Sequence, residues 1–204
     1  MIFLIGDSHV QSLTGPDFKL IHLPSPTAYQ NYKRIPSIEE ELKKLTVNKE
    51  NDILFFSFGE IDIRCHLGFI SDKTSRTYED VVIECIKRYE SFLDHFINDG
   101  FKVGVWGVIP SGPNNGVQGN GAISYKTRIE RNIITNIFNN QLIDLCNKKN
   151  IHFKSVYDII IKDELNYDKY YSKDNIHLNA GMFKTHGTNI NCEQLTIDQF
   201  KDLL

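Results

Sequence analysis

The sequence predicts an α/β protein in which helices pack around a parallel β-sheet. Short apolar runs alternate with amphipathic segments, and each run ends in a turn that contains Gly or Pro. The run Ile53–Phe58 is almost continuously apolar, as expected for a central strand that is covered on both faces. A length of 204 residues suits one domain, and we expect residues 1–204 to form a single one.

Five strands are expected along the chain, one at each of the short apolar runs. Their approximate bounds are Met1–Gly6, Phe18–Leu23, Asp52–Phe58, Phe101–Ile109 and Ile151–Val156. The intervals between them are long enough for the crossover helices that join parallel strands.

Helices are expected in the remaining intervals. The first begins at Ser37, whose hydroxyl can cap the first turn while Glu40 reaches back. The second begins with the same arrangement at Thr77 and Asp80 and ends at Gly100. Two more are expected at 124–149, with an apolar stripe, and at 196–204. The stripe consists of Ile129, Ile133, Ile137 and Leu142.

Charge and cysteine content narrow the classes of function. The chain carries 23 Lys and Arg against 26 Asp and Glu, a formal net charge of -3, so we expect neither nucleic acid nor an anionic membrane as partner. The opening apolar run is too short for a signal peptide, and no stretch approaches the roughly 18 apolar residues of a membrane span. The four cysteines are widely spaced without a CxxC pair, which is typical of reduced thiols. We therefore expect a cytoplasmic protein.

One long irregular segment, Pro110–Ala122, follows the fourth expected strand and is rich in Gly and Asn. Open α/β sheets bind ligands beyond the C-terminal ends of their strands, so this segment is a candidate lid or substrate loop. A plain surface insertion fits the same composition.

Two short motifs contain candidates for nucleophilic catalysis. Gly-Asp-Ser-His at positions 6–9 follows the first strand and leads into a helical segment, whose amides can flank a nucleophile at Ser8. Near the other end, Asp174 and His177 are three residues apart, so the carboxylate can accept the Nδ1 hydrogen and leave Nε2 to take a proton from a serine. Each motif alone also fits an ordinary turn or cap, and the second fits half a metal site. His9, next to Ser8, could shape the pocket, although a residue beside a helix start is more often exposed.

Together the two motifs resemble those of the SGNH hydrolases, also called the GDSL esterase family. The resemblance implies a three-layer α/β/α sandwich with a flavodoxin-like parallel sheet of about five strands, and it implies neither metal nor cofactor. It makes Ser8 the nucleophile, His177 the general base and then acid, and Asp174 the residue that orients the imidazole. The expected chemistry is acyl transfer through an acyl-enzyme.

The oxyanion hole departs from the family pattern. The family has a Gly-x-Asn-Asp motif here, and this chain has Ile61 in place of the Asn, so one side-chain donor is lost. Loss of such a donor typically costs about 2.7–4 kcal/mol of transition-state stabilisation. A second family Gly corresponds to Ser25, whose backbone amide can still donate. The predicted oxyanion hole consists of Ser8, Ser25, Gly59 and Arg64.

Polar and apolar residues alternate between Glu60 and His66, which would place the polar ones on one face of an extended segment. Arg64 can then replace the missing donor, or it can form an ion pair with Glu60 or Asp62. Metal ligation by Glu60, Asp62 and His66 is a further interpretation, although triad chemistry leaves a metal no role. The residues expected to bind substrate are Tyr29, Glu60, Asp62 and Asn179.

The predicted function is hydrolysis of a small acyl ester, acetyl being the default, on a carbohydrate or glycan. A sugar O-acyltransferase would use the same triad and exclude water. A catalytically silent glycan-binding domain would keep the fold and lack an effective oxyanion hole at Ile61. A cofactor-binding flavodoxin-like domain is disfavoured because neither GxGxxG nor a P-loop occurs.

Overall fold

The computed structural model describes residues 1–13, 15–112, 124–185, 187 and 189–204. Five strands form one sheet in the order β2-β1-β3-β4-β5, and every neighbouring pair is parallel. The α/β class and the five strands are therefore confirmed, with β4 and β5 shorter than expected. The strands are β1 (Ile2–Gly6), β2 (Phe18–His22), β3 (Ile53–Ser57), β4 (Lys102–Trp106) and β5 (His152–Lys154).

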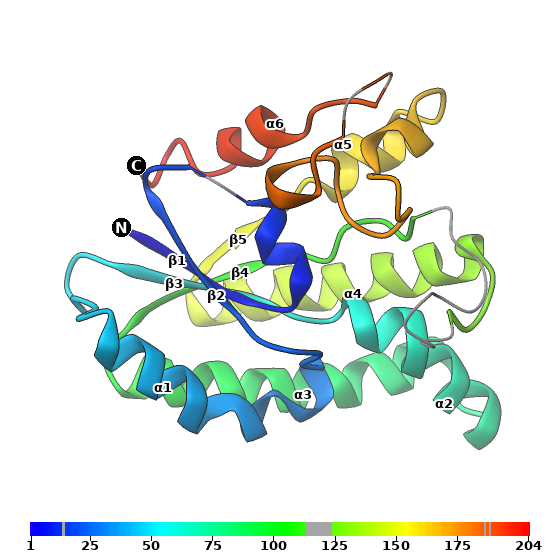
Figure 1. Ribbon diagram of the computed structural model, residues 1–204. Coiled ribbons are helices and arrows are strands. Elements are labelled where there is room, and N and C mark those ends of the chain that lie inside the picture. The colour runs from blue at the N-terminus through cyan, green and yellow to red at the C-terminus, as the bar shows by residue number, and fades with distance from the viewer. Residues whose placement is uncertain (14, 113–123, 186, 188) are drawn as a thin grey trace.

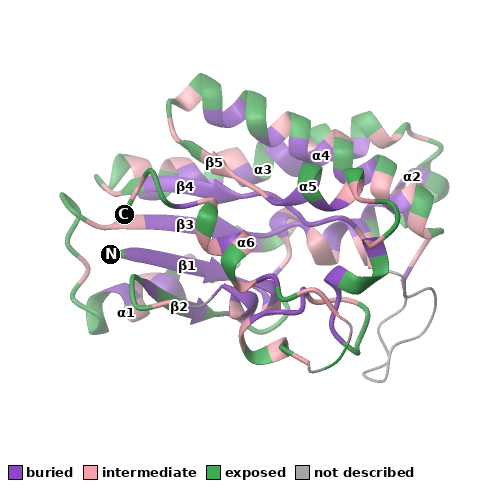
Figure 2. Ribbon diagram, turned by 90° about the horizontal axis from the view of Figure 1, so that it is seen from above, coloured by how far each residue is buried: buried purple, intermediate pink, exposed green. Residues whose placement is uncertain are grey.

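Helices cover both faces of this sheet, as Figure 1 shows. One face packs against α1 (Ile35–Lys44), α3 (Tyr78–Asn98) and α4 (Arg128–Lys149), and the other against α5 (Tyr157–Lys162) and α6 (Glu193–Asp198). Alternate strand side chains enter two separate apolar clusters: Phe56 joins the first and Phe55 the second. The three central strands β1, β3 and β4 are mostly buried between the layers (Figure 2), whereas the edge strands β2 and β5 are partly exposed. This is the predicted α/β/α sandwich.

Shorter helical elements connect these layers. The 3₁₀ helices are Ser8–Ser12, Ala28–Arg34, Tyr167–Tyr170 and Gly181–Phe183. A π-helical turn at Asp62–Leu67 continues into α2 (Gly68–Thr74). None of the helices within the described residues combines the length and the apolar character that a membrane span requires.

Helix α1 starts two residues before the predicted cap. Its N-terminal flanking residue is Arg34, which makes no side-chain capping bond, and Pro36 occupies the first turn, where a missing N–H costs little. The Ser37 hydroxyl donates to the Arg34 carbonyl at 2.9 Å instead of capping the amides. The predicted cap at Ser37 was therefore wrong, because Pro36 already fits the first turn.

The start of α3 is as predicted, since Thr77 accepts a hydrogen bond from the Asp80 amide at 3.1 Å. Helix α6 begins three residues earlier than expected, at Glu193, and ends at Asp198.

Helix α4 differs from its prediction in its start and in its buried face. It begins at Arg128, after a capping box that was not predicted: the Thr127 side chain accepts from the Glu130 amide, and the Glu130 side chain accepts from the Thr127 amide. In the predicted stripe, Ile129 and Ile133 are 72% and 48% exposed, whereas Ile137 packs against the core and Leu142 is buried as predicted. The buried positions include Ile134, Phe138, Leu142 and Leu145. Both series contain residues four apart, so periodicity alone did not distinguish two neighbouring faces of the helix.

Residues 113–123, most of the candidate lid at 110–122, lie outside the described residues. The chain on either side is held by one buried side chain: Arg131 donates to the Lys126 carbonyl at 2.7 Å and to the Gly112 carbonyl at 3.4 Å. Gly112 also packs so closely on Asn175 that a β-carbon there would collide with the Asn175 carbonyl. The segment therefore begins beside the loop that carries Asp174.

Candidate active site

Three predicted site segments meet at one edge of the sheet. In the parallel register, Gly6 of β1 lies opposite His22 of β2 and Ser57 of β3. Ser8 and Gly59 follow two residues after the ends of β1 and β3, and Ser25 follows three after the end of β2. Because the C-terminal ends of parallel strands share an edge, residues far apart in sequence lie side by side there.

The Gly-Asp-Ser order has a local physical cause. A β-carbon at Gly6 would collide with the Ser57 carbonyl, so only Gly allows β1 to lie this close to β3. Asp7 then caps the short helix, accepting the His9 amide hydrogen at 2.9 Å. Ser8 is thereby fixed as the first residue of that helix, with its side chain partly exposed.

The three predicted catalytic residues form a continuous line of hydrogen bonds. Ser8 Oγ lies 2.6 Å from His177 Nε2, although the two residues are 169 positions apart. His177 Nδ1 lies 2.6 Å from Asp174 Oδ2. Because an ionised carboxylate can only accept, Nδ1 carries the hydrogen and Nε2 accepts from the Ser8 hydroxyl. This is the arrangement of a nucleophile, a general base and an orienting carboxylate.

Asp174 is held in its ionised form by its surroundings. Its other oxygen accepts from the Ser172 hydroxyl at 2.6 Å and from the amides of Ile176 and His177 at 2.9 and 3.0 Å. Burial opposes ionisation, but these donors and the His177 ring outweigh it and hold the pKa of Asp174 well below its ordinary value.

His177 is enclosed between two rings. His9 lies on one side with ring centroids 4.6 Å apart, and Phe183 stacks nearly parallel on the imidazole at 3.8 Å. Burial lowers the pKa of His177, the hydrogen bond to Asp174 opposes this, and the charge on His9 lowers the pKa further. The base is therefore neutral at pH 7, as proton abstraction requires.

His9 is buried, whereas an exposed position was expected. It is only 6% exposed, and its Nδ1 lies 3.0 Å from Asp7 Oδ1. Its position after the nucleophile was the only signal that could have marked it, since its burial depends on residues from the far end of the chain. Phe183 was missed for the same reason.

Two residues of the predicted oxyanion hole, Ser25 and Gly59, have a positive φ. Ser25 has a φ of 46°, in the left-handed region that favours glycine, which is consistent with the Gly that the family has there. Gly59 has a φ of 122°, and a β-carbon there would collide with Phe138 and Val108. Neither amide donates a hydrogen bond to another residue within the part of the chain that the structure describes.

The segment from Glu60 to His66 is helical, which corrects the expected extended conformation. The chain turns at Gly59 and enters the π-helical turn, so residues four apart share a face. Arg64 Nε consequently donates to Glu60 Oε1 at 2.6 Å, the ion pair that the sequence left open. Arg64 Nη1 and Glu60 Oε2 are enclosed and have no hydrogen-bond partner among the described residues.

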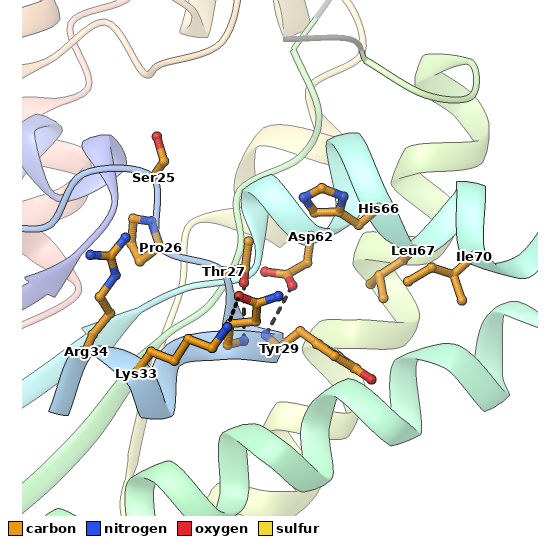
Figure 3. Close-up of a pocket in the computed structure, with 11 residues that line it drawn as sticks. Ser25, Pro26, Thr27, Tyr29, Lys33, Arg34, Asp62, His66, Leu67 and Ile70 are labelled. Atoms are coloured by element: carbon orange, nitrogen blue, oxygen red, sulfur yellow. Dashed lines mark hydrogen bonds between the residues drawn. The ribbon is translucent and has the colours of Figure 1, made fainter.

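Asp62 is a structural clamp between two segments, and it also lines the cavity shown in Figure 3. It is 1% exposed, and it accepts the amide hydrogens of Ala28 at 2.6 Å and Tyr29 at 3.1 Å, as Figure 3 shows for Tyr29. Burial raises the pKa of Asp62 to about 7, against the effect of the two amides. The clamp joins the end of β3 to the loop after β2 that carries Ser25.

We expect Asp62→Asn to lower the free energy of unfolding by about 1–3 kcal/mol. An Asn side chain has one oxygen and one NH₂ group, so its NH₂ group would face one of the two backbone N–H groups that Asp62 binds, and that N–H would lose its acceptor. Urea unfolding measures this. Asp198→Asn, on the exposed side of α6, is the matched control and is expected to leave the unfolding free energy nearly unchanged. Equal unfolding free energies for both variants would contradict the clamp.

Two other predicted substrate residues use their side chains in hydrogen bonds within the protein, although Tyr29 also lines the cavity described below. The Tyr29 hydroxyl donates to Glu84 on α3 at 2.8 Å. Asn179 is 1% exposed, donates to the Ile190 carbonyl, and accepts from the Thr185 amide and hydroxyl. The prediction that Asn179 binds substrate was therefore wrong: its side chain holds the chain that follows the catalytic histidine.

A cavity of about 560 Å³ opens beside the Ser25 loop (Figure 3). It lies between that loop, the helix Ala28–Arg34 and the helical segment after β3. Its hydrogen-bonding side chains include Ser25, Thr27, Gln30, Lys33, Arg34 and His66. Gln30, Lys33 and Arg34 belong to no motif, and only their position shortly after Ser25 could have indicated them.

The metal interpretation finds no support in the geometry. Asp62 faces two amides and Glu60 faces Arg64, so these carboxylates do not converge on His66. Across the described ranges, no group of three or more His, Cys, Asp or Glu side chains could hold a metal ion.

Comparison with known proteins gives a likeness in fold. No family model and no curated protein matches the sequence. The native aryl esterase of M. smegmatis has a TM-score of 0.57 at 14% identity, covering 100% of this chain and 99% of its own. A GDSL-like lipase from Bacteroides thetaiotaomicron also has a TM-score of 0.57 at 14% identity, covering 99% and 84%. An acetyl xylan esterase has a TM-score of 0.52 at 14% identity, covering 88% and 92%.

These neighbours share the α/β/α architecture, and the chain therefore has the fold of the SGNH, or GDSL, hydrolases. The fold that the two motifs implied is confirmed.

Proposed function

We propose that this protein is a serine esterase of the SGNH type that removes a small acyl group, acetyl by preference, from a carbohydrate. The observation that carries the proposal is the hydrogen-bonded line from Asp174 through His177 to Ser8. It lies at the C-terminal edge of a sheet whose fold is that of esterases and lipases.

The proposed reaction has two halves. His177 Nε2 takes the Ser8 proton while Oγ attacks the ester carbonyl, and the protonated ring then gives that proton to the departing sugar oxygen as the C–O bond breaks. A water next attacks the acyl-enzyme, with His177 again taking the proton, and the ring returns this proton to Ser8 Oγ as the bond between Oγ and the acyl carbon breaks. The products are a carboxylic acid, the sugar alcohol and free Ser8.

The oxyanion is bound in this proposal by the amides of Ser8, Ser25 and Gly59 together with Arg64. Two of these amides have no described partner, as an oxyanion hole requires before substrate arrives. Arg64 supplies the side-chain donor that Ile61 cannot.

We expect Arg64→Ala to lower kcat about 10²–10³-fold with little change in KM, because a donor to the oxyanion acts mainly in the transition state. Initial rates with p-nitrophenyl acetate measure both constants. Arg128→Ala is the control, since that guanidinium pairs with the exposed Asp168. If the two variants have equal kcat, Arg64 is only the partner of Glu60.

The carbohydrate part of the proposal is supported by the cavity beside Ser25. Its hydroxyl, amide and cationic side chains can donate to the many hydroxyl groups of a sugar. One structural neighbour is an acetyl xylan esterase, which agrees with an acetylated saccharide as substrate.

A panel of esters tests the proposal. We expect fluorophosphonate labelling at Ser8 and faster acetate release from acetylated oligosaccharides than acid release from long-chain p-nitrophenyl esters. Transfer of acetyl to an added sugar in place of acetate release would indicate the O-acyltransferase. A protein that is neither labelled nor active, yet binds acetylated sugars, would be the silent glycan-binding domain.

We also propose that the protein works in a reducing compartment such as the cytoplasm. All four cysteines are free thiols. Burial raises the pKa of Cys146 and of Cys192 to about 12, which keeps these two thiols protonated and unreactive.

A further inference from the structure

A second histidine–aspartate pair, His9 and Asp7, lies next to the pair of His177 and Asp174. His9 Nδ1 and the His9 amide both donate to Asp7 Oδ1, at 3.0 and 2.9 Å. Both residues are buried. The Asp7 carboxylate therefore fixes the position of the His9 ring and requires a hydrogen on its Nδ1.

The His9 ring faces the general base. Its centroid lies 4.6 Å from that of His177, with the two planes inclined at 36°. Phe183 covers His177 from a second direction, and Asp174 and Ser8 bind its two nitrogens. A charge on His9 would therefore act on His177 across a short distance from which water is excluded.

The surroundings of the second His9 nitrogen are compatible with a charge on the ring. His9 Nε2 and Glu60 Oε2 are both enclosed without a hydrogen-bond partner among the described residues. Both residues border a cavity of about 10 Å³, together with Asp7 and Ser57, which is near the volume that one water needs. A water there can accept from Nε2–H and donate to Glu60, so that both nitrogens of His9 act as donors.

The charges around the two rings agree. Burial lowers the pKa of His9, but Asp7 outweighs this effect, with a contribution from Glu60 and against one from Arg64, and the pKa is raised to about 9. His177 is faced by Asp174 and Glu60, which favour its protonated form, and by His9, which disfavours it. Beside Phe183, Lys184 is paired with Glu193 and offers no free charge.

We propose that His9 is a positioning residue: an imidazolium anchored by Asp7 that lies against His177 and resists its protonation. In the reaction proposed above, on which this role in turnover rests, the same repulsion makes protonated His177 a stronger acid toward the departing sugar oxygen. Among the described residues the His9 side chain makes no hydrogen bond to the Ser8 hydroxyl, so in this proposal it acts through His177.

Histidine NMR titration tests the charge directly, without any substrate. In His9→Phe, which keeps a ring against His177 but removes the charge, we expect the His177 pKa to rise by at least about 0.5 unit. His9→Gln, which can still donate to Asp7, is expected to give the same direction. His95→Gln removes an exposed histidine that pairs with Glu39 and is expected to leave the pKa unchanged.

An unchanged His177 pKa in a folded His9→Phe or His9→Gln variant overturns the proposal. A rise in His9→Gln alone also overturns it, because the cause would then be lost packing. With p-nitrophenyl acetate, the acidic limb of the kcat/KM profile is expected to move to higher pH by the same amount. A shifted titration in a protein without esterase activity would refute the proposed function and leave the charge on His9 established.

Discussion

Ser8→Ala is expected to lower kcat for p-nitrophenyl acetate by at least about 10⁴-fold and to abolish fluorophosphonate labelling. The hydroxyl oxygen is the atom that attacks, and its side-chain hydrogen bond goes to His177 Nε2. Alanine leaves the cap at Asp7 intact, because that cap uses the His9 amide. The variant should therefore fold with an unchanged melting temperature while losing turnover.

Ser12→Ala is the matched control for this change. Ser12 belongs to the same short helix, is 2% exposed, and its hydroxyl has no hydrogen-bond partner among the described residues. We expect it to retain wild-type rates and labelling. Labelling that persists in Ser8→Ala and disappears in another serine variant would transfer the nucleophile to that serine.

Asp174→Asn is expected to lower kcat by about 10³–10⁴-fold with little change in KM. Asp174 Oδ1 accepts from three donors, so the oxygen of an Asn side chain must occupy that position. The amide nitrogen is then directed at His177 Nδ1, which must accept. The hydrogen of the ring moves to Nε2, where it blocks removal of the Ser8 proton.

The pH dependence of this variant gives an independent check. The pKa of Asp174 lies well below its ordinary value, so the loss of wild-type activity in acid comes from protonation of His177. Asp174 raises the pKa of His177, so removing its charge should move the acidic limb of the residual activity to lower pH, opposite to the His9 variants. Asp168→Asn, on the surface, is the control. Wild-type kcat in Asp174→Asn would show that the carboxylate does not orient the base.

The features that were predictable from the sequence depend on neighbouring residues. The strands follow from short apolar runs, and the turn at Gly6 and the start of α3 at Thr77 follow from single residues. Asp174 and His177 were found because three residues of one loop suffice to bring a carboxylate to an imidazole. Joining this pair to Ser8 required the family resemblance, since nothing local connects positions 169 residues apart.

The features that were not predictable depend on partners from elsewhere in the fold. The alternation after Gly59 suggested an extended segment, yet a buried carboxylate at Asp62 finds its donors in the loop after β2, and the helical turn allows it to reach them. Asn179 was expected to bind substrate because it follows His177. Its side-chain nitrogen instead donates to the Ile190 carbonyl, and its side-chain oxygen accepts from the Thr185 amide. His9 was expected to be exposed. It is buried against the ring of His177, a contact that no pattern near position 9 predicts.

The guanidinium of Arg131 affects how the sequence between Gly112 and Lys126 can change in a protein of this fold. It joins the carbonyls of Gly112 and Lys126, so the chain enters and leaves the interval between them at fixed anchor points. Insertions and replacements within that interval need not disturb β4 or α4, since lengthening a closed loop adds little entropic cost. Gly112, the first of these anchor points, packs against Asn175, which is next to Asp174. An insertion that follows Gly112 would therefore begin beside the loop that carries Asp174. The sequence there can then change independently of Ser8, Asp174 and His177.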